Sequence, residues 1–332
     1  MTGPSYDVVG IGNALTDITV TVSDAFLKEN ALQKGGMTLV DQDRATHLHG
    51  LLPPGSQGPG GSCGNTMAGL AALGARTAYI GRVRDDRIGD IFRREIRAAG
   101  VAFNTPPATG GPGSGLCLVM VTPDAERTLC TFLGAASSLG PEDIDPETIR
   151  RGRILYLEGY LFDRDSAKQA FVRAAEAAHD GGKTRVALSL SDPFCVDRHR
   201  AAFRQLVANH VDILFGNRQE YLSLYQTDSL DEALLAARAH CGLACVTDGA
   251  AGALLATADG VTAVAAVPVD RVVDSNGAGD QYAAGVLFGL SRNAPPDICG
   301  RIGALTGAEA VSHHGARPQR SLKPEAEALL GG

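Results

Sequence analysis

The sequence has no long apolar run, no basic cluster and no C-x-x-C pair. None of its apolar stretches approaches the roughly 20 residues that a membrane-spanning helix needs. Lys and Arg total 30 against 37 Asp and Glu, so the formal net charge is −7. Without a basic stretch, the chain offers neither nucleic acid nor an anionic membrane surface an electrostatic binding site. Neither is therefore an expected partner.

The seven cysteines are scattered along the chain. Cys241 and Cys245 are four residues apart, but no second pair completes a zinc site. The N-terminal segment has no basic region followed by a long apolar one, so we expect no signal peptide. Buried, reduced thiols and a cytoplasmic location are the expectation.

From residue 154 onward, short apolar runs alternate with helical patterns. Strands alternating with helices imply a parallel sheet that helices cover on both faces. The predicted strands are Ile154–Leu157, Val186–Leu190, Ile213–Phe215 and Ala244–Thr247, and the helices include Ser166–His179, Arg198–Ala208, Leu230–His240, Gly277–Leu290 and Asp297–His313. The sequence therefore predicts the α/β class.

The first third of the chain is less regular. Predicted strands at Thr19–Val22, Met37–Val40, Leu116–Val121 and Thr128–Phe132 fall outside the alternation. We interpret them as a small sheet added at about residues 16–42 and 104–134 to a single domain spanning 1–332. The segment Leu51–Gly64 is rich in Gly and Pro, which predicts a loop.

One segment near the C-terminus carries the strongest chemical signal. Asp274-Ser275-Asn276-Gly277-Ala278-Gly279-Asp280 leads into a predicted helix. Small residues at a helix start leave N–H groups free to hold an anion, and Asp280 would face the anion's reaction partner. The alternative is that Gly-Ala-Gly lets the helix pack closely on a strand while Asp280 caps it.

Two common nucleotide-binding patterns are absent. Gly10-x-Gly12 follows a strand, but Leu15 stands where the dinucleotide fingerprint requires its third glycine. The glycine-rich segment 111–115 has no lysine, so it is not a P-loop. These absences argue against a dinucleotide-dependent oxidoreductase and against a P-loop kinase.

The segment ending at Asp280 resembles the C-terminal signature of the ribokinase-like (PfkB) family of sugar and nucleoside kinases. Three more segments resemble family motifs in the family's order: Gly60-Gly61-Ser62-Cys63-Gly64-Asn65, Asn217-Arg218-Gln219-Glu220, and Val246-Thr247-Asp248-Gly249-Ala250-Ala251-Gly252. Two further segments resemble those of the adenosine kinases: Gly12-Asn13-Ala14-Leu15-Thr16-Asp17, and Leu188-Ser189-Leu190-Ser191-Asp192-Pro193-Phe194, with Ser189 where Asn is usual. The lysine that ribokinases carry inside the Gly-Gly motif is absent.

The resemblance implies a ribokinase-like three-layer α/β/α fold, whose central, mostly parallel sheet is flanked by helices and joined by a small β-sheet lid. It implies transfer of the ATP γ-phosphoryl group to a primary hydroxyl, foremost the 5′-hydroxyl of adenosine. The alternative acceptors are ribose, fructose and 2-keto-3-deoxygluconate. A non-catalytic nucleoside binder is a third interpretation, against which the intact Asp280 and Glu220 argue. The added sheet would act as a lid on a monomer or as the interface of a homodimer.

The resemblance also assigns roles to residues. Asp280 would be the catalytic base, with a low pKa at its helix N-terminus. The other catalytic groups would be Gly277, Ala278, Gly279 and Arg127. The substrate-binding residues would be Asn13, Asp17, Gly60, Gly61 and Asn65. The ATP side would consist of Asn217, Thr247, Gly249, Gly252, Asn276 and His314.

Glu220 would hold Mg²⁺ through water, and the residues leave open whether K⁺ is also used. Simpler interpretations exist for several residues near the proposed site. Arg127 would be an exposed turn residue, Glu220 a helix first-turn acid and Asp17 a strand-edge turn residue. His313 and His314 would merely end a helix, instead of flanking the adenine together with Gly315, Ala316 and Arg317.

Overall fold

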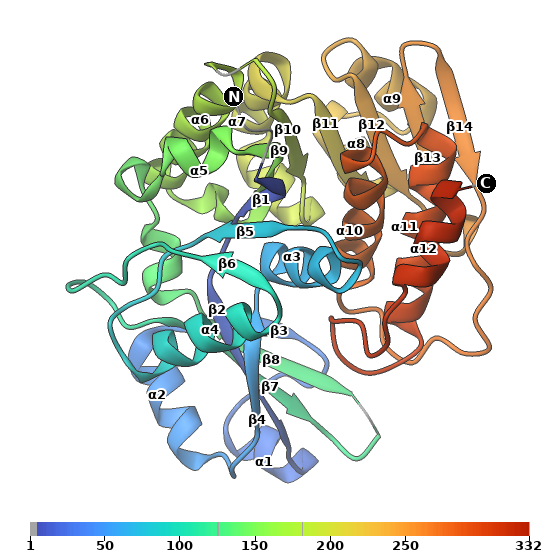
Figure 1. The fold of residues 1–332 in the computed structure, drawn as a ribbon. Helices are drawn as coiled ribbons and strands as arrows, with labels where there is room; N and C mark the ends of the chain where they lie inside the picture. Colours follow the sequence, from blue (N-terminus) through green and yellow to red (C-terminus); the bar gives the residue numbers. More distant parts are fainter. Residues whose placement is uncertain (1–4, 125, 181, 332) are drawn as a thin grey trace.

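The apolar runs form one nine-stranded sheet in the computed structural model, which describes residues 5–124, 126–180 and 182–331. The strand order is β14-β13-β12-β11-β10-β9-β1-β5-β6 (Figure 1). From β6 to β12 neighbouring strands are parallel, and β13 and β14 add an antiparallel hairpin at the edge. The bounds are β1 Tyr6–Ile11, β5 Thr77–Ile80, β6 Val101–Phe103, β9 Gly152–Glu158, β10 Arg185–Ser189, β11 Ile213–Asn217, β12 Leu243–Thr247, β13 Ala253–Thr257 and β14 Gly260–Val264.

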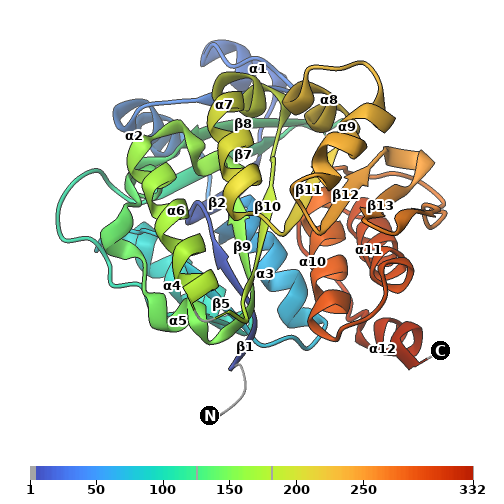
Figure 2. The same ribbon diagram turned by 90° about the horizontal axis from the view of Figure 1, so that it is seen from above.

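Helices cover both faces of this sheet (Figure 2). Successive residues of a strand point to opposite faces, so Val9 packs into one core while Val8 packs into the other. On the Val9 face lie α5 Pro146–Arg150, α6 Asp165–Asp180, α7 Pro193–His210, α8 Arg218–Tyr225 and α9 Leu230–Arg238. On the Val8 face lie α3 Ser62–Ala72, α4 Arg87–Ala98, α10 Ala278–Ser291, α11 Pro296–Val311 and α12 Lys323–Gly331. The predicted three-layer α/β/α fold is confirmed.

A second, five-stranded sheet, here called the lid sheet, has the order β3-β8-β7-β2-β4. Its bounds are β2 Leu15–Thr21, β3 Met37–Leu39, β4 Ser56–Gly60, β7 Gly115–Val121 and β8 Arg127–Phe132. One face packs into a small separate core with α1 Asp24–Glu29 and α2 Gln42–Leu51, through residues such as Ile18 and Leu118. The alternate residues Asp17 and Cys117 face the opposite way, into a cavity. Strand alternation thus gives the lid sheet a structural face and a face free for ligand.

Several predicted element boundaries are wrong, among them that of the helix predicted at Arg198–Ala208, which begins at Pro193. The segment Leu51–Gly64 is not one loop, because β4 pairs antiparallel with β2 and α3 begins at Ser62. The sequence Ser-Gln-Gly-Pro-Gly has no apolar pattern, and Pro59 fits because β4 is an edge strand. The last predicted helix ends at Val311 instead of His313.

Other expectations concern single residues and helices. All seven cysteines are free and buried. Ala125, between the predicted strands Leu116–Val121 and Thr128–Phe132, lies outside the described residues. No helix in the described part of the chain is both long and apolar enough to cross a membrane.

Candidate active site

A cavity of about 650 Å³ lies where the parallel strands end and the lid sheet begins. Asn13 lies just after β1, and the last residues of β9, β11 and β12 are Glu158, Asn217 and Thr247. Ligands of open α/β sheets bind outside the carboxyl ends of the strands, and the volume is typical of small-molecule sites. The topology therefore gathers polar side chains from distant parts of the chain into one place.

Gly277 creates an open group of backbone donors at the floor of this cavity. It caps α10 with φ of +77°, and a Cβ there would clash with Ala316, so only glycine fits. Within the described residues, the N–H groups of Gly277, Gly279 and Asp280 have no protein acceptor, whereas Ala278 donates to the Ser275 carbonyl at 3.3 Å. Three free donors at a helix N-terminus form an anion site.

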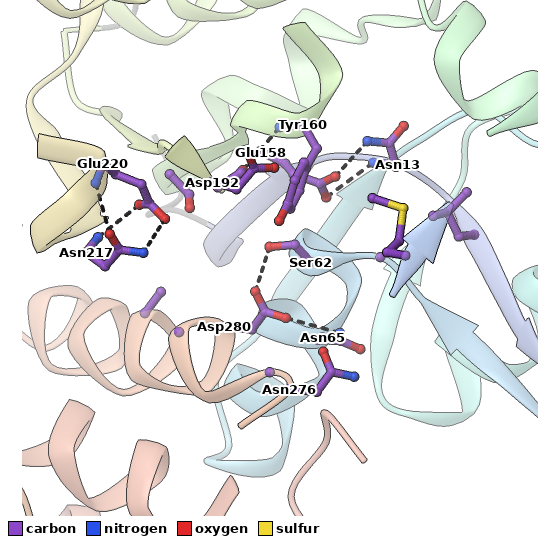
Figure 3. Close-up of a pocket in the computed structure, with 18 of the residues that line it drawn as sticks. Asn13, Ser62, Asn65, Glu158, Tyr160, Asp192, Asn217, Glu220, Asn276 and Asp280 are labelled. Atoms are coloured by element: carbon purple, nitrogen blue, oxygen red, sulfur yellow. Dashed lines mark hydrogen bonds between the residues drawn. The ribbon is translucent and has the colours of Figure 1, made fainter. Parts of the chain in front are cut away.

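Asp280 faces this anion site from the first turn of α10. Two residues of α3 hold its carboxylate, because the Ser62 hydroxyl donates to Oδ1 at 2.6 Å and Asn65 Nδ2 donates to Oδ2 at 3.1 Å (Figure 3). Burial raises the pKa of Asp280 to about 6, against the opposing effect of these hydrogen bonds and of Arg317. The expected low pKa is therefore wrong, since loss of water outweighs the helix dipole at this buried position.

Asp17 lines the cavity, and Arg317 lies close enough to it to affect its charge. Burial raises the pKa of Asp17 to about 6, while Arg317 and Arg127 favour its ionised form. Burial lowers the pKa of Arg317 to about 10, and its Nε donates to Asn65 Oδ1 at 3.3 Å. Arg317 thus lies beside Asn65 and the two acids. His314 of the same segment is exposed and does not line the cavity.

Glu158 is a cavity residue that the sequence motifs did not identify. Its Oε1 accepts from Asn13 Nδ2 at 2.7 Å (Figure 3). Its Oε2 accepts from the Cys63 N–H at 2.8 Å. Burial raises its pKa to about 7. An acid at the carboxyl end of a buried parallel strand was the available signal, since that is where ligands bind. Asn13 is consequently oriented by a carboxylate before any substrate arrives.

Glu220 and Asp192 place two further carboxyl groups in the lining of the cavity. Glu220 forms a capping box with Asn217, whose backbone N–H and side-chain Nδ2 donate to it at 2.9 and 2.6 Å. Burial raises the pKa of Glu220 to about 7, and the nearby Asp192 adds to this effect. An excess of buried negative charge suits a hydrated divalent cation. Among the described residues no three His, Cys, Asp or Glu side chains are grouped so that they could hold a metal ion by themselves.

The predicted site residues divide into two groups, according to whether they line the cavity. Those that line the cavity are Asn13, Asp17, Gly61, Asn65, Asn217, Glu220, Thr247, Asn276, Gly277, Gly279 and Asp280. Those outside its lining are Gly60, Arg127, Gly249, Gly252, Ala278 and His314. Gly252 has a structural reason of its own, because its φ is +93° and a Cβ would clash with the Val264 carbonyl. Arg127 pairs with Asp274 at 2.7 Å.

Comparison with known proteins gives a consistent family. Residues 36–322 match the model described as pfkB family carbohydrate kinase. The crystal structure of adenosine kinase from Sinorhizobium meliloti is 43% identical, with a TM-score of 0.87 over 97% of this chain and 99% of that one. A probable sugar kinase from Rhizobium etli is 41% identical, with a TM-score of 0.88 over 98% of each chain. The 5-dehydro-2-deoxygluconokinase of Geobacillus kaustophilus is 27% identical over 77% of this chain and 79% of its own.

Proposed function

The chain belongs to the pfkB family of carbohydrate kinases, and from that premise we propose that it transfers the γ-phosphoryl group of ATP to the 5′-hydroxyl of adenosine. One observation carries the proposal: free N–H groups at the start of α10 and the carboxylate of Asp280 face the same cavity as Asp17. The first would hold phosphate oxygens, the second would accept a proton, and the third would bind paired hydroxyls.

An apolar wall favours a nucleoside over a bare sugar. Met37 and Leu39 of the lid sheet are 58% and 52% exposed, and Phe194 at the start of α7 is 76% exposed, yet all three line the cavity. A planar base would cover these side chains and remove apolar surface from water, whereas a sugar has little apolar surface to offer. The resemblance to an adenosine kinase supports the same choice.

In the proposed reaction the 5′-hydroxyl oxygen attacks the γ-phosphorus as the bond to the ADP oxygen breaks. The hydroxyl proton passes to Asp280, whose position Ser62 and Asn65 fix. Mg²⁺ bound with ATP would neutralise phosphate charge. Glu220 and Asp192 would hold that ion through water, which suits the two carboxyl groups on their wall of the cavity.

A panel of acceptors tests the proposal. ADP release with MgATP is measured for adenosine, other nucleosides, ribose, fructose, 2-keto-3-deoxygluconate and 5-dehydro-2-deoxygluconate. We expect the highest kcat/KM with adenosine. A higher kcat/KM with a sugar would refute adenosine as the substrate but would leave the kinase activity in place. If no acceptor gave ATP-dependent turnover, both the substrate and the kinase activity would be refuted.

Gly60→Ala is expected to raise KM for adenosine by about tenfold. A Cβ at Gly60 would overlap the Asp17 carboxylate, so Asp17 must move away from the substrate end of the cavity. A displaced charge-assisted hydrogen bond costs about 1.5 kcal/mol or more. Gly58→Ala is the matched control in the same strand, because a Cβ there meets no atom within 4 Å. Equal KM values for the two variants would contradict this prediction.

Ser62→Ala is expected to move the acid limb of the kcat/KM profile to higher pH by about one unit. The Ser62 hydroxyl donates to the ionised form of Asp280, so its removal raises a pKa that is already about 6. Because the base must be ionised, activity is present above this pKa and is lost as the pH falls through it. A pH series of kcat/KM measures the shift, and Ser62→Thr, which keeps the hydroxyl, is expected to retain the wild-type limb. An unmoved limb in Ser62→Ala would assign the titration to another group.

A further inference from the structure

A mostly buried ion pair connects the lid sheet to the loop that precedes α10. Arg127 Nη1, at the start of β8, lies 2.7 Å from Asp274 Oδ2, and the two side chains are only 16% and 10% exposed. Among the Arg and Lys ion pairs of the described residues, no other has both side chains less than a fifth exposed. The pair is therefore far better shielded from solvent than a surface salt bridge, and loss of either charge is costly.

Asp274 also holds backbone on both sides of the anion site. Its Oδ1 accepts from the Asn276 N–H at 3.0 Å, and its Oδ2 accepts from the Gly315 N–H at 3.0 Å. Asn276 directly precedes Gly277, and Gly315 precedes Ala316, against which Gly277 packs. Asp274 itself does not line the cavity. One carboxylate thus fixes the two backbone segments that shape the anion site without touching the ligand.

The charge that balances Asp274 comes from the lid sheet. A lid movement that withdrew Arg127 would leave a mostly buried carboxylate without its counter-charge. The carboxylate would then move toward solvent or take up a proton, and either change would weaken its two contacts with backbone N–H groups. Arg127 Nε is buried and has no hydrogen-bond partner in the described part of the chain, so the contact of Nη1 with Asp274 is the one that holds the guanidinium. The position of β8 and the shape of the anion site are therefore linked through this ion pair.

We propose that Asp274 is a positioning residue that, through Arg127, couples lid closure to the geometry of the phosphate-binding N–H groups. The inference rests on the proposed kinase function. Because the coupling is between two residues, each single substitution should disable it and the second should add little. In the alternative, Arg127 would contact only the phosphate, and the effect of replacing Arg127 would not depend on Asp274.

The test compares Arg127→Met, Asp274→Asn and the double variant, with kcat/KM for ATP as the readout. We expect each single change to lower it by about 10- to 100-fold and the double change to be no worse than the poorer single one. Millimolar guanidinium chloride is expected to restore Arg127→Met at least fivefold, but to leave the double variant unchanged because Asp274 is no longer there to hold the ion. Lys168→Met, which removes an exposed pair with Asp165, is the control and should behave as wild type.

Two results would overturn the coupling while leaving the kinase in place. One is a double variant whose loss equals the product of the single losses, and the other is guanidinium rescue that persists without Asp274. Hydrogen exchange gives a readout independent of turnover. Arg127→Met should speed exchange of the amides at 274–280 at least fivefold, and unchanged exchange there would also refute the coupling. Absence of turnover in the wild type, with the exchange effect present, would instead count against the proposed function alone.

Discussion

Asp280→Asn is expected to lower kcat by about 10²–10⁴-fold, which is the usual contribution of a positioned general base. The amide oxygen still accepts the Ser62 hydroxyl, whereas the contact with Asn65 Nδ2 is lost because the amide nitrogen is not an acceptor. The amide also has no lone pair basic enough to take the substrate proton. KM for the acceptor should change little, since Asp17 and Asn13 would carry that binding. Steady-state kinetics measure both quantities, and circular dichroism checks the fold.

The control for Asp280→Asn is Asp90→Asn. Asp90 is likewise an acid in a helix first turn, but it is exposed and lies in α4. Asp90→Asn should lower the free energy of unfolding by a few tenths of a kcal/mol, because its interaction with the helix dipole is lost, and should leave kcat unchanged. If Asp280→Asn kept more than a tenth of wild-type kcat, its role as base would be refuted.

Elements with a clear periodic pattern were predictable from the sequence, and edge elements were not. The strands of the parallel sheet are buried on both faces, so they appear as short continuous apolar runs, and the predicted strand Ile154–Leu157 lies within β9. Strand β4 has no such run, because it is held by backbone hydrogen bonds to β2 and contributes no apolar side chain to the small core. Composition favoured a loop, and only tertiary pairing makes it a strand.

The candidate site was predictable where a motif is local in the chain, and less so where it is assembled. Gly277 to Asp280 form one turn, so small residues beside an acid predict an anion site directly. The pKa of Asp280 depends on its burial against α3, whose Ser62 lies 218 residues away in the sequence. The local helix dipole therefore predicted the wrong direction for the pKa shift. Glu158 reaches the site only because β9 lies beside β1 in the sheet.

Asp17→Ala is expected to lower kcat/KM for adenosine by about 10²–10⁴-fold, chiefly through KM. In the proposed complex its carboxylate accepts two ribose hydroxyls, and hydrogen bonds to a charged group contribute about 1.5–3 kcal/mol each. The partners Arg317 and Arg127 would also keep positive charge in a half-buried site without their acid. Thr19→Ala is the control in the same strand, because Thr19 does not line the cavity.

Substrate analogues separate a direct contact of Asp17 from a structural role. The wild type should discriminate against 2′,3′-dideoxyadenosine by about as much as Asp17→Ala loses on adenosine, because each change removes the same hydrogen bonds. Combining the two should then cost little more than either alone, whereas independent effects would multiply. Asp17 carries one carboxylate facing the cavity, and Gly60 beside it has no side chain to take over its place, so no neighbouring acid of β2 or β4 can compensate. An unchanged KM for adenosine in Asp17→Ala would remove this residue from the substrate site and, with it, the reason for expecting a vicinal diol.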